Sequence, residues 1–395
     1  MQMGEFLGRQ SVQFDNPPYL LAASSIVGKK ESEGPLGSLF DEIIEDPMAG
    51  QDNWEEGESE FVRRAIQLAI TKAGLKNSDI RYLFAGDLLG QLIATSFGVK
   101  DFEIPLFGIY GACSSAGEGI SLAAMMVAAG YADHAVAASS SHFGSAEKQF
   151  RFPLEYGNQR PLSSTWTVTG SGAFVVSTRK SQIKIGGITT GKIVDYGIKD
   201  SMNMGAAMAP AAAQVIYQHL QDFKRNPEDY DKIITGDLGT IGQEILIRLL
   251  KENGYDISKQ HMDCGIEIYS SEDQDTNAGG SGCACSAVTL SSLVVPKICN
   301  GQWKRVLFVR QAHIGEIFFV YRTERKALTV HTGRITVDGN LHLVNVRQRR
   351  QRINQRIDHD RLLYIIVLCP KTVIQTDIAD PICHRHIHKR CLRRN

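Results

Sequence analysis

The sequence predicts a layered α/β fold made of two successive halves. Short apolar runs typical of buried strands alternate with longer segments of helical periodicity. This alternation runs once over residues 1–180 and again over residues 181–309. The halves share no visible sequence identity, so the repeat rests on element order alone. We therefore expect two pseudo-symmetric βα halves arranged in layers.

In the first half, Pro18 and Gly28 bound an apolar run that predicts a strand over 19–27. Apolar residues at helical spacing predict a helix over 59–73, which Gly74 ends. Residues 115–130 are small and apolar nearly all round, which predicts a buried helix. The other expected strands cover 81–85, 104–110, 134–140 and 167–177.

The second half repeats this order of elements. An extended segment over 183–196 precedes a helix over 206–220. Strands are expected at 232–235, 264–269 and 305–309, and helices at 241–252 and 283–297. The last helix follows a glycine-rich turn at 279–282.

The composition excludes several classes of protein. With 43% hydrophobic and 22% charged residues, the 395-residue chain is neither disordered nor collagen-like. No apolar run reaches the ~20 residues that a membrane-spanning helix needs. We see no secretory signal, and eight irregularly spaced cysteines favour a reducing compartment.

The C-terminal segment differs from the rest of the chain. Residues 310–395 contain 17 Lys and Arg but only 7 Asp and Glu, and only 3 of the 37 glycines. We interpret 310–395 as an atypical basic tail produced by a reading-frame shift, which would leave the body without its last strand. The alternative is a genuine basic extension that binds anionic lipid or nucleic acid.

Cys113 is the sharpest chemical signal because it lies where a strand turns into a buried helix. Free N–H groups at a helix start lower the pKa of a thiol, although a small buried cysteine in a tight turn has the same pattern. His142 closes a strand and is a candidate base or a loop histidine. Arg151 lies in a stretch that alternates cations with aromatics, which suits a planar anion or a solvated loop. Cys283 and Cys285 lack a partner cluster, so we expect no metal and no cofactor.

Several longer stretches resemble a known family. Gly111-Ala112-Cys113-Ser114 resembles the thiolase-like fold of condensing enzymes. The stretches at 132–142, 147–153, 166–173, 263–265 and 279–287 are similar to the stage V sporulation protein AD family. We expect this resemblance to extend from the N-terminus to about Val309.

The resemblance implies a binding protein and not an enzyme. The family is known for binding dipicolinic acid in the pocket that corresponds to a condensing-enzyme active site. It supports dipicolinate uptake, with calcium, into the developing spore. It implies a peripheral location at the spore inner membrane, membrane-spanning partner proteins, and a homodimer. No nucleic-acid partner is expected.

The residues favour the same conclusion. Ketoacyl synthase III enzymes place a histidine after the strand at 232–235, where this chain has Gly236-Asp237-Leu238. The second residue that they pair with the cysteine, an asparagine or another histidine, lies in the turn that here reads Gly279-Gly280-Ser281-Gly282. The alternatives are an acyltransferase of the ketoacyl synthase III type and a scaffold with a vestigial pocket. The ligand-binding residues that we predict are Cys113, His142, Arg151, Thr165, Trp166 and Ser281.

Overall fold

A computed structural model describes residues 4–150, 160–200, 202–311 and 314–323. Within these residues the two halves carry the same five-strand order. In the first half the neighbours are β6 (Leu106–Gly108), β5 (Tyr82–Asp87), β7 (His134–Ser141), β9 (Gly170–Ser177) and β3 (Tyr19–Gly28). In the second half they are β12 (His261–Asp263), β11 (Lys232–Thr235), β14 (Arg305–Gln311), β15 (Ile314–Arg322) and β10 (Ile183–Ile193).

The pairing directions match as well. In each half, in the order just given, the first two pairs of neighbouring strands are parallel and the last two pairs are antiparallel. β10 and β3 join the halves into one sheet. The smaller strands are β1 (Gly4–Leu7), β2 (Ser11–Phe14), β4 (Glu42–Ile44), β8 (Trp166–Thr167) and β13 (Gly280–Ser281). The predicted α/β fold with two pseudo-symmetric halves is confirmed, whereas the boundary at residue 180 stays a prediction.

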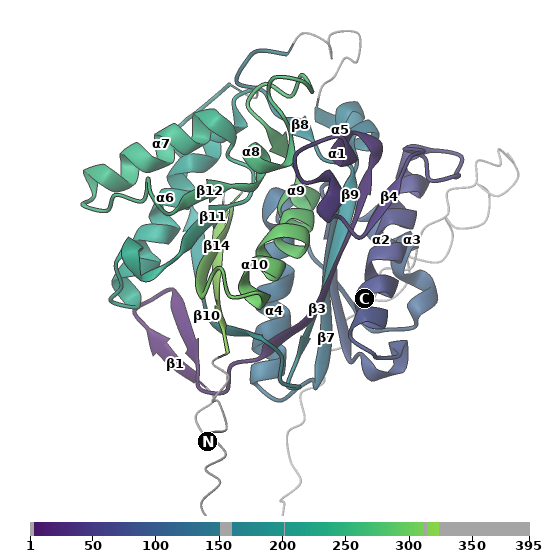
Figure 1. The fold of residues 1–395 in the computed structure, drawn as a ribbon, viewed down its shortest axis with the longest axis horizontal. Helices are drawn as coiled ribbons and strands as arrows, with labels where there is room; N and C mark the ends of the chain where they lie inside the picture. The colour runs from purple at the N-terminus through teal and green to yellow at the C-terminus, as the bar shows by residue number, and fades with distance from the viewer. Residues whose placement is uncertain (1–3, 151–159, 201, 312–313, 324–395) are drawn as a thin grey trace, which may run out of the picture. The chain divides into compact units, whose positions relative to one another are not determined.

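Helices lie between the halves and outside them (Figure 1). The central ones are α4 (Ser115–Ala128), α9 (Cys283–Thr289) and α10 (Val295–Cys299). On one side lie α2 (Trp54–Lys72) and α3 (Ile93–Val99), and on the other α6 (Met204–Asp222) and α7 (Gly239–Glu252). The described residues also form three short helices: α1 (Lys29–Ser32), α5 (Phe143–Phe150) and α8 (Cys264–Ile268).

The largest apolar cluster packs α4 and α9 against strands of both halves. A second cluster packs Phe61, Ile66 and Ile70 of α2 against β5, β7 and β9. A third packs α6 and α7 against β11 and β14. Buried apolar area of this extent is the main source of stability, at roughly 25 cal/mol per Å².

Three predicted elements need correction. The helix expected at 59–73 begins at Trp54, because Asn53 caps it by accepting the Glu56 N–H at 2.9 Å. The strand expected at 264–269 is wrong: β12 ends at Asp263, whose side chain caps α8. A short apolar run does not distinguish a strand from a buried helical turn. The helix expected at 283–297 is interrupted by a π-helical turn, Leu290–Val294.

The prediction that the body lacks its last strand is also wrong. β14 continues to Gln311, and β15 follows as an antiparallel strand between β14 and β10. β15 takes the place in the second half that β9 takes in the first. Averages over 310–395 concealed a strand of 9 residues. The frame-shift interpretation itself stays a prediction, and residues 324–395 lie outside the described residues.

Candidate functional site at the carboxyl ends of the strands

Cys113 lies in a tight turn, Ala112–Ser114, between β6 and α4, as the sequence predicts. Ala112 adopts a positive φ of 47°, which is an energetically unfavourable conformation for any residue other than glycine. Two hydroxyls fix the turn: Ser114 Oγ donates to the Gly111 carbonyl at 2.7 Å, and Ser115 Oγ donates to the Ala112 carbonyl at 2.8 Å. The turn holds the half-buried Cys113 at the carboxyl edge of the sheet.

Asp237, which follows β11, is the group that faces the thiol. It is fully buried, accepts the Gly282 N–H at 3.0 Å, and hydrogen-bonds to the Cys113 side chain. Burial raises the pKa of Asp237 to about 6, and the Arg310 guanidinium opposes this rise. Burial, and then the negative charge of Asp237, raise the pKa of the Cys113 thiol well above its usual value. The thiol is therefore held in its protonated form.

Arg310 is a second residue that the sequence reasoning missed. It is fully buried in β14 and donates from Nη2 to the Cys113 carbonyl. Its charge groups it with the basic segment 310–395, and a fully buried arginine is rare, so the sequence does not predict its place in the site. The signal available for Asp237 is its position after the strand Lys232–Thr235, where the expected histidine is absent.

His142 follows the end of β7, as predicted, but its ring is already engaged. Nε2 lies 2.7 Å from the Pro47 carbonyl oxygen, and Nδ1 accepts the Gly144 N–H at 3.0 Å. These partners require a neutral ring with its proton on Nε2. Burial lowers the pKa of His142, which favours the same form. The ligand-binding role of His142 stays a prediction. Its two hydrogen bonds indicate that the ring holds the backbone at Pro47 and Gly144 in place.

Trp166 and Ser281 meet through the short parallel pair β8 and β13, in which Trp166 aligns with Gly280 and Ser281 with Thr167. The Trp166 ring stacks on Phe143, with centroids 4.0 Å apart and an interplanar angle of 5°. Thr165 is buried beside this pair. Because Gly282 follows Ser281 and bonds to Asp237, the turn is joined to the Cys113 position. The structure thus brings Cys113, Thr165, Trp166 and Ser281 to one edge.

Two cations that we had not predicted lie over the Trp166 ring. The Lys30 Nζ is 4.3 Å from the ring centroid and the Arg160 guanidinium carbon is 4.8 Å away. Lys30 Nζ also donates to the Gln274 carbonyl at 2.6 Å, which fixes its position. Arg151, the cation predicted for this site, lies outside the described residues.

A small pocket of about 230 Å³ lies beside this edge and contains two buried carboxyl groups. Glu58 of α2 accepts hydrogen bonds from Ser140 Oγ at 2.8 Å and Ser145 Oγ at 2.9 Å. Burial, with the nearby charge of Asp87, raises the pKa of Glu58 to about 8. Asp87 ends β5 and accepts both the N–H and the hydroxyl of Thr95. Glu58 is therefore largely protonated at neutral pH.

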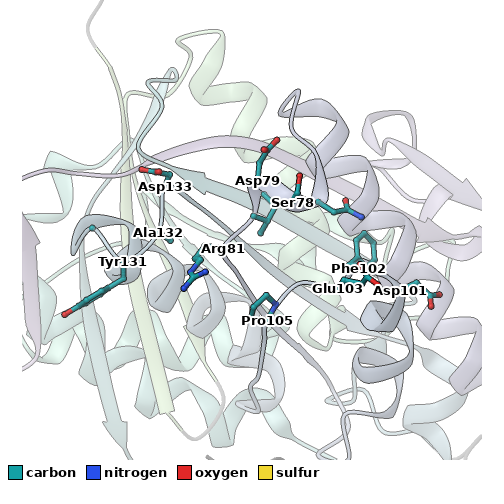
Figure 2. A pocket seen from close by; sticks show the side chains of 13 residues that line it. Ser78, Asp79, Arg81, Asp101, Phe102, Glu103, Pro105, Tyr131, Ala132 and Asp133 are labelled. Carbon is teal, nitrogen blue, oxygen red and sulfur yellow. The ribbon is translucent and has the colours of Figure 1, made fainter. Parts of the chain in front are cut away.

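A larger pocket, of about 730 Å³, lies at the opposite edge (Figure 2). Arg81 precedes β5 and Asp133 precedes β7, so the pocket is at the amino ends of these strands. Asp79, Asp101 and Glu103 add three further acidic side chains to its lining. None of the predicted site residues that the structure describes lines it.

The described part of the chain holds no group of three or more His, Cys, Asp and Glu side chains that could bind a metal ion. Cys283 Sγ donates to the Ser140 carbonyl at 2.7 Å, and Cys285 Sγ donates to the Gly236 carbonyl. Among the same residues, no helix combines the length and apolar character needed to cross a bilayer.

Comparison with known proteins gives both a family and a fold. A model of the family described as Stage V sporulation protein AD (SpoVAD) matches residues 8–322. Stage V sporulation protein AD of Bacillus subtilis is 44% identical over 302 residues, which cover 76% of this chain and 89% of that protein.

Condensing enzymes are among the solved structures that resemble the chain. Xanthomonas campestris OleA bound with cerulenin superposes with a TM-score of 0.54 at 15% identity, over 80% of this chain and 98% of that chain. The 3-oxoacyl-(acyl carrier protein) synthase III of Xanthomonas oryzae gives a TM-score of 0.53 at 14% identity, over 80% of this chain and 100% of that chain. At this identity the likeness shows a thiolase-like fold and nothing about activity.

Proposed function

The chain belongs to the stage V sporulation protein AD family, and on this premise we propose that it binds dipicolinic acid at the carboxyl edge, without catalysis. The ligand is a flat pyridine with two carboxylates. It enters as the free dianion or as its calcium chelate, and binding supports its uptake into the developing spore. The family name ties the chain to sporulation; the ligand and the transport role are our proposals.

The pairing of Cys113 with Asp237 is the observation that carries the loss of catalysis. A condensing enzyme needs a thiolate, which a nearby histidine or cation stabilises. Here burial, and then the buried carboxyl group that faces the thiol, raise its pKa. Such a thiol attacks an acyl thioester slowly, since the thiolate is the nucleophile. Transfer of an acyl group from acyl-coenzyme A to Cys113, followed by mass spectrometry, would favour the acyltransferase alternative.

The donors for a dicarboxylate are grouped around Trp166. Lys30 supplies positive charge beside the ring, and the Arg160 guanidinium, which is paired with Asp275 at 2.5 Å, lies over the same ring. Ser281 and Thr165 supply hydroxyl groups. Charge-assisted hydrogen bonds to carboxylates are about twice as strong as neutral ones. Arg151 is retained as a further cation of the proposed site.

Calorimetric titration of dipicolinate into the full chain tests the proposal. Replacing Trp166 with leucine removes the aromatic ring over which Lys30 and Arg160 lie, so we expect the affinity for dipicolinate to fall about tenfold. Trp303→Leu is the matched control, because Trp303 precedes β14 at the opposite edge. Cys113→Ala and Arg151→Ala should also weaken binding. Equal affinity of the wild type and all of these variants would refute the site.

The proposed partners are membrane-spanning proteins of the same sporulation system, at the spore inner membrane, and a second copy of the chain. The edge strand β6 supports the homodimer, because it pairs only with β5 among the described strands. Its Leu106 and Phe107 are 38% and 47% exposed, and Phe97 of α3 is 60% exposed. An unpaired edge with apolar side chains favours pairing with another chain. Sedimentation of the wild type and Phe107→Lys distinguishes a dimer from a monomer.

A further inference from the structure

A row of alternating aromatic and cationic residues crosses four strands at the amino edge. Tyr19 of β3 pairs with Lys184 of β10, Lys184 pairs with Tyr321 of β15, and Tyr321 pairs with Arg305 of β14. Side chains of directly paired residues point to the same face of a sheet. The strand register therefore aligns these four side chains, which are far apart in sequence.

Contacts within the row hold its cations in place. The Lys184 Nζ lies 5.6 Å from the centroid of the Tyr19 ring and 5.8 Å from that of Tyr321, so the ammonium is close to both rings. Arg305 Nη1 donates to the Asp229 carbonyl at 3.1 Å. Cation–ring contacts of this kind restrict a long side chain without neutralising its charge.

The row forms part of a groove of about 1160 Å³. Lys180, Lys304 and Arg322 add three more cations, against the two acids Asp229 and Asp231. Asp231 Oδ2 accepts the backbone N–H groups of Lys304 at 2.6 Å and Arg305 at 2.9 Å. Across the described residues, none of the five cations forms an ion pair. The groove thus concentrates positive charge in a concave surface.

We propose that this groove binds the phosphate groups of a polyanionic ligand. Several unpaired cations around one concavity match a ligand with several anionic oxygens, and an arginine fork suits phosphate geometry. The C-terminal segment, residues 324–395, does not supply this negative charge, since it contains 15 Lys and Arg and only 6 Asp and Glu. The site is distinct from the proposed dipicolinate site at the other edge.

Two probes separate a free phosphate compound from a lipid headgroup. Tripolyphosphate is titrated into the full chain by calorimetry, and vesicles with and without phosphatidylglycerol are used in co-sedimentation. The test variant is K180E combined with K304E, two exposed groove residues. The control, K76E combined with K259E, makes the same charge change at exposed sites outside the groove and keeps the basic C-terminal segment.

We expect the groove variant to bind one of the probes about tenfold more weakly than the control variant, with wild-type affinity falling as salt increases. Tripolyphosphate binding would assign a free phosphate ligand, and binding only to phosphatidylglycerol vesicles would assign a headgroup. Equal affinities of the groove and control variants would overturn the proposal, because binding would then depend on the overall charge of the chain and not on the groove. Failure of the wild type to bind either probe would also overturn it.

Discussion

The carboxyl and amino edges of the same sheet differ in how their ionisable groups are buried and paired. At the carboxyl edge, Cys113 and Asp237 are paired with each other, and burial raises the pKa of both. At the amino edge, Lys184 and Arg305 are partly exposed to solvent and have no acidic partner within ion-pair distance among the described residues. The difference teaches that a buried site suppresses reactivity through desolvation, whereas an open groove attracts a ligand through unpaired charge.

Removal of β15 should have the largest effect, because this strand runs from one edge to the other. A chain that ends at Thr323 keeps β15, whereas one that ends at Val309 leaves backbone groups of β10 and β14 unpaired. Each such group costs about 1–3 kcal/mol where it is buried, against a typical total stability of about 5–15 kcal/mol. Circular dichroism and urea unfolding should find only the longer chain folded. Cooperative unfolding of the shorter chain would refute this role of β15.

Glu58 should make stability depend on pH. Its pKa is raised from 4.5 to about 8 in the folded chain, so stability is fully present below about pH 4.5 and declines as the pH rises to about 8. Glu58→Gln removes the ionisable group, so the stability of the variant should not decline in this way. The difference in unfolding free energy between variant and wild type should therefore shift in favour of the variant by about 2–4 kcal/mol from pH 5 to pH 8. Urea unfolding at both pH values measures this. Parallel pH profiles would mean that Glu58 ionises normally.

Asp237→Asn should raise the reactivity of Cys113 by a smaller amount. The substitution removes the negative charge beside the sulfur and retains an oxygen that can accept the Gly282 N–H. We expect the thiol pKa to fall and alkylation by iodoacetamide near pH 8 to rise about tenfold. Peptide mass spectrometry resolves Cys113 from the other cysteines, and Cys299 serves as the internal control. No change at Cys113 would show that desolvation alone suppresses it.

The smallest effect is expected at the amino edge. Lys304 is exposed, and its side chain forms no ion pair among the described residues. Four other cations and only two acids line the same groove. Lys304→Ala should therefore change the unfolding free energy by less than about 0.5 kcal/mol, or stabilise the chain slightly. A larger loss would reveal a structural ion pair and so weaken the contrast between the two edges. Thermal unfolding at low salt is the measurement.

The sequence predicts elements with a long periodic pattern more reliably than those that depend on register. Strand 232–235 and the helix beginning at 115 are placed correctly, since their apolar patterns are continuous. The strand 314–322 was missed because it lies in a segment whose average charge and glycine content differ from those of the body. Pairing with β10 and β14 defines it, and such long-range pairing leaves no local signal.

The candidate site shows the same limit. The Cys113 turn could be predicted, because glycine and small residues before an apolar helix form a local pattern. Lys30 and Arg160 could not, because each reaches the site from a separate element and depends on tertiary packing. The position of Asp237 after strand 232–235 was a signal, but its pairing with Cys113 depends on the same packing. His142 shows the converse: its position at a strand end was predicted, but the Pro47 carbonyl that engages its ring is distant in sequence.

The location of bound dipicolinate in a crystal of the full chain would test the central claim most directly. We predict that the pyridine ring lies at the carboxyl edge, in contact with Trp166 and near Cys113 and Ser281, with no covalent bond to sulfur. Dipicolinate found only in the cationic groove at the amino edge, or a ligand attached covalently to Cys113, would contradict the account.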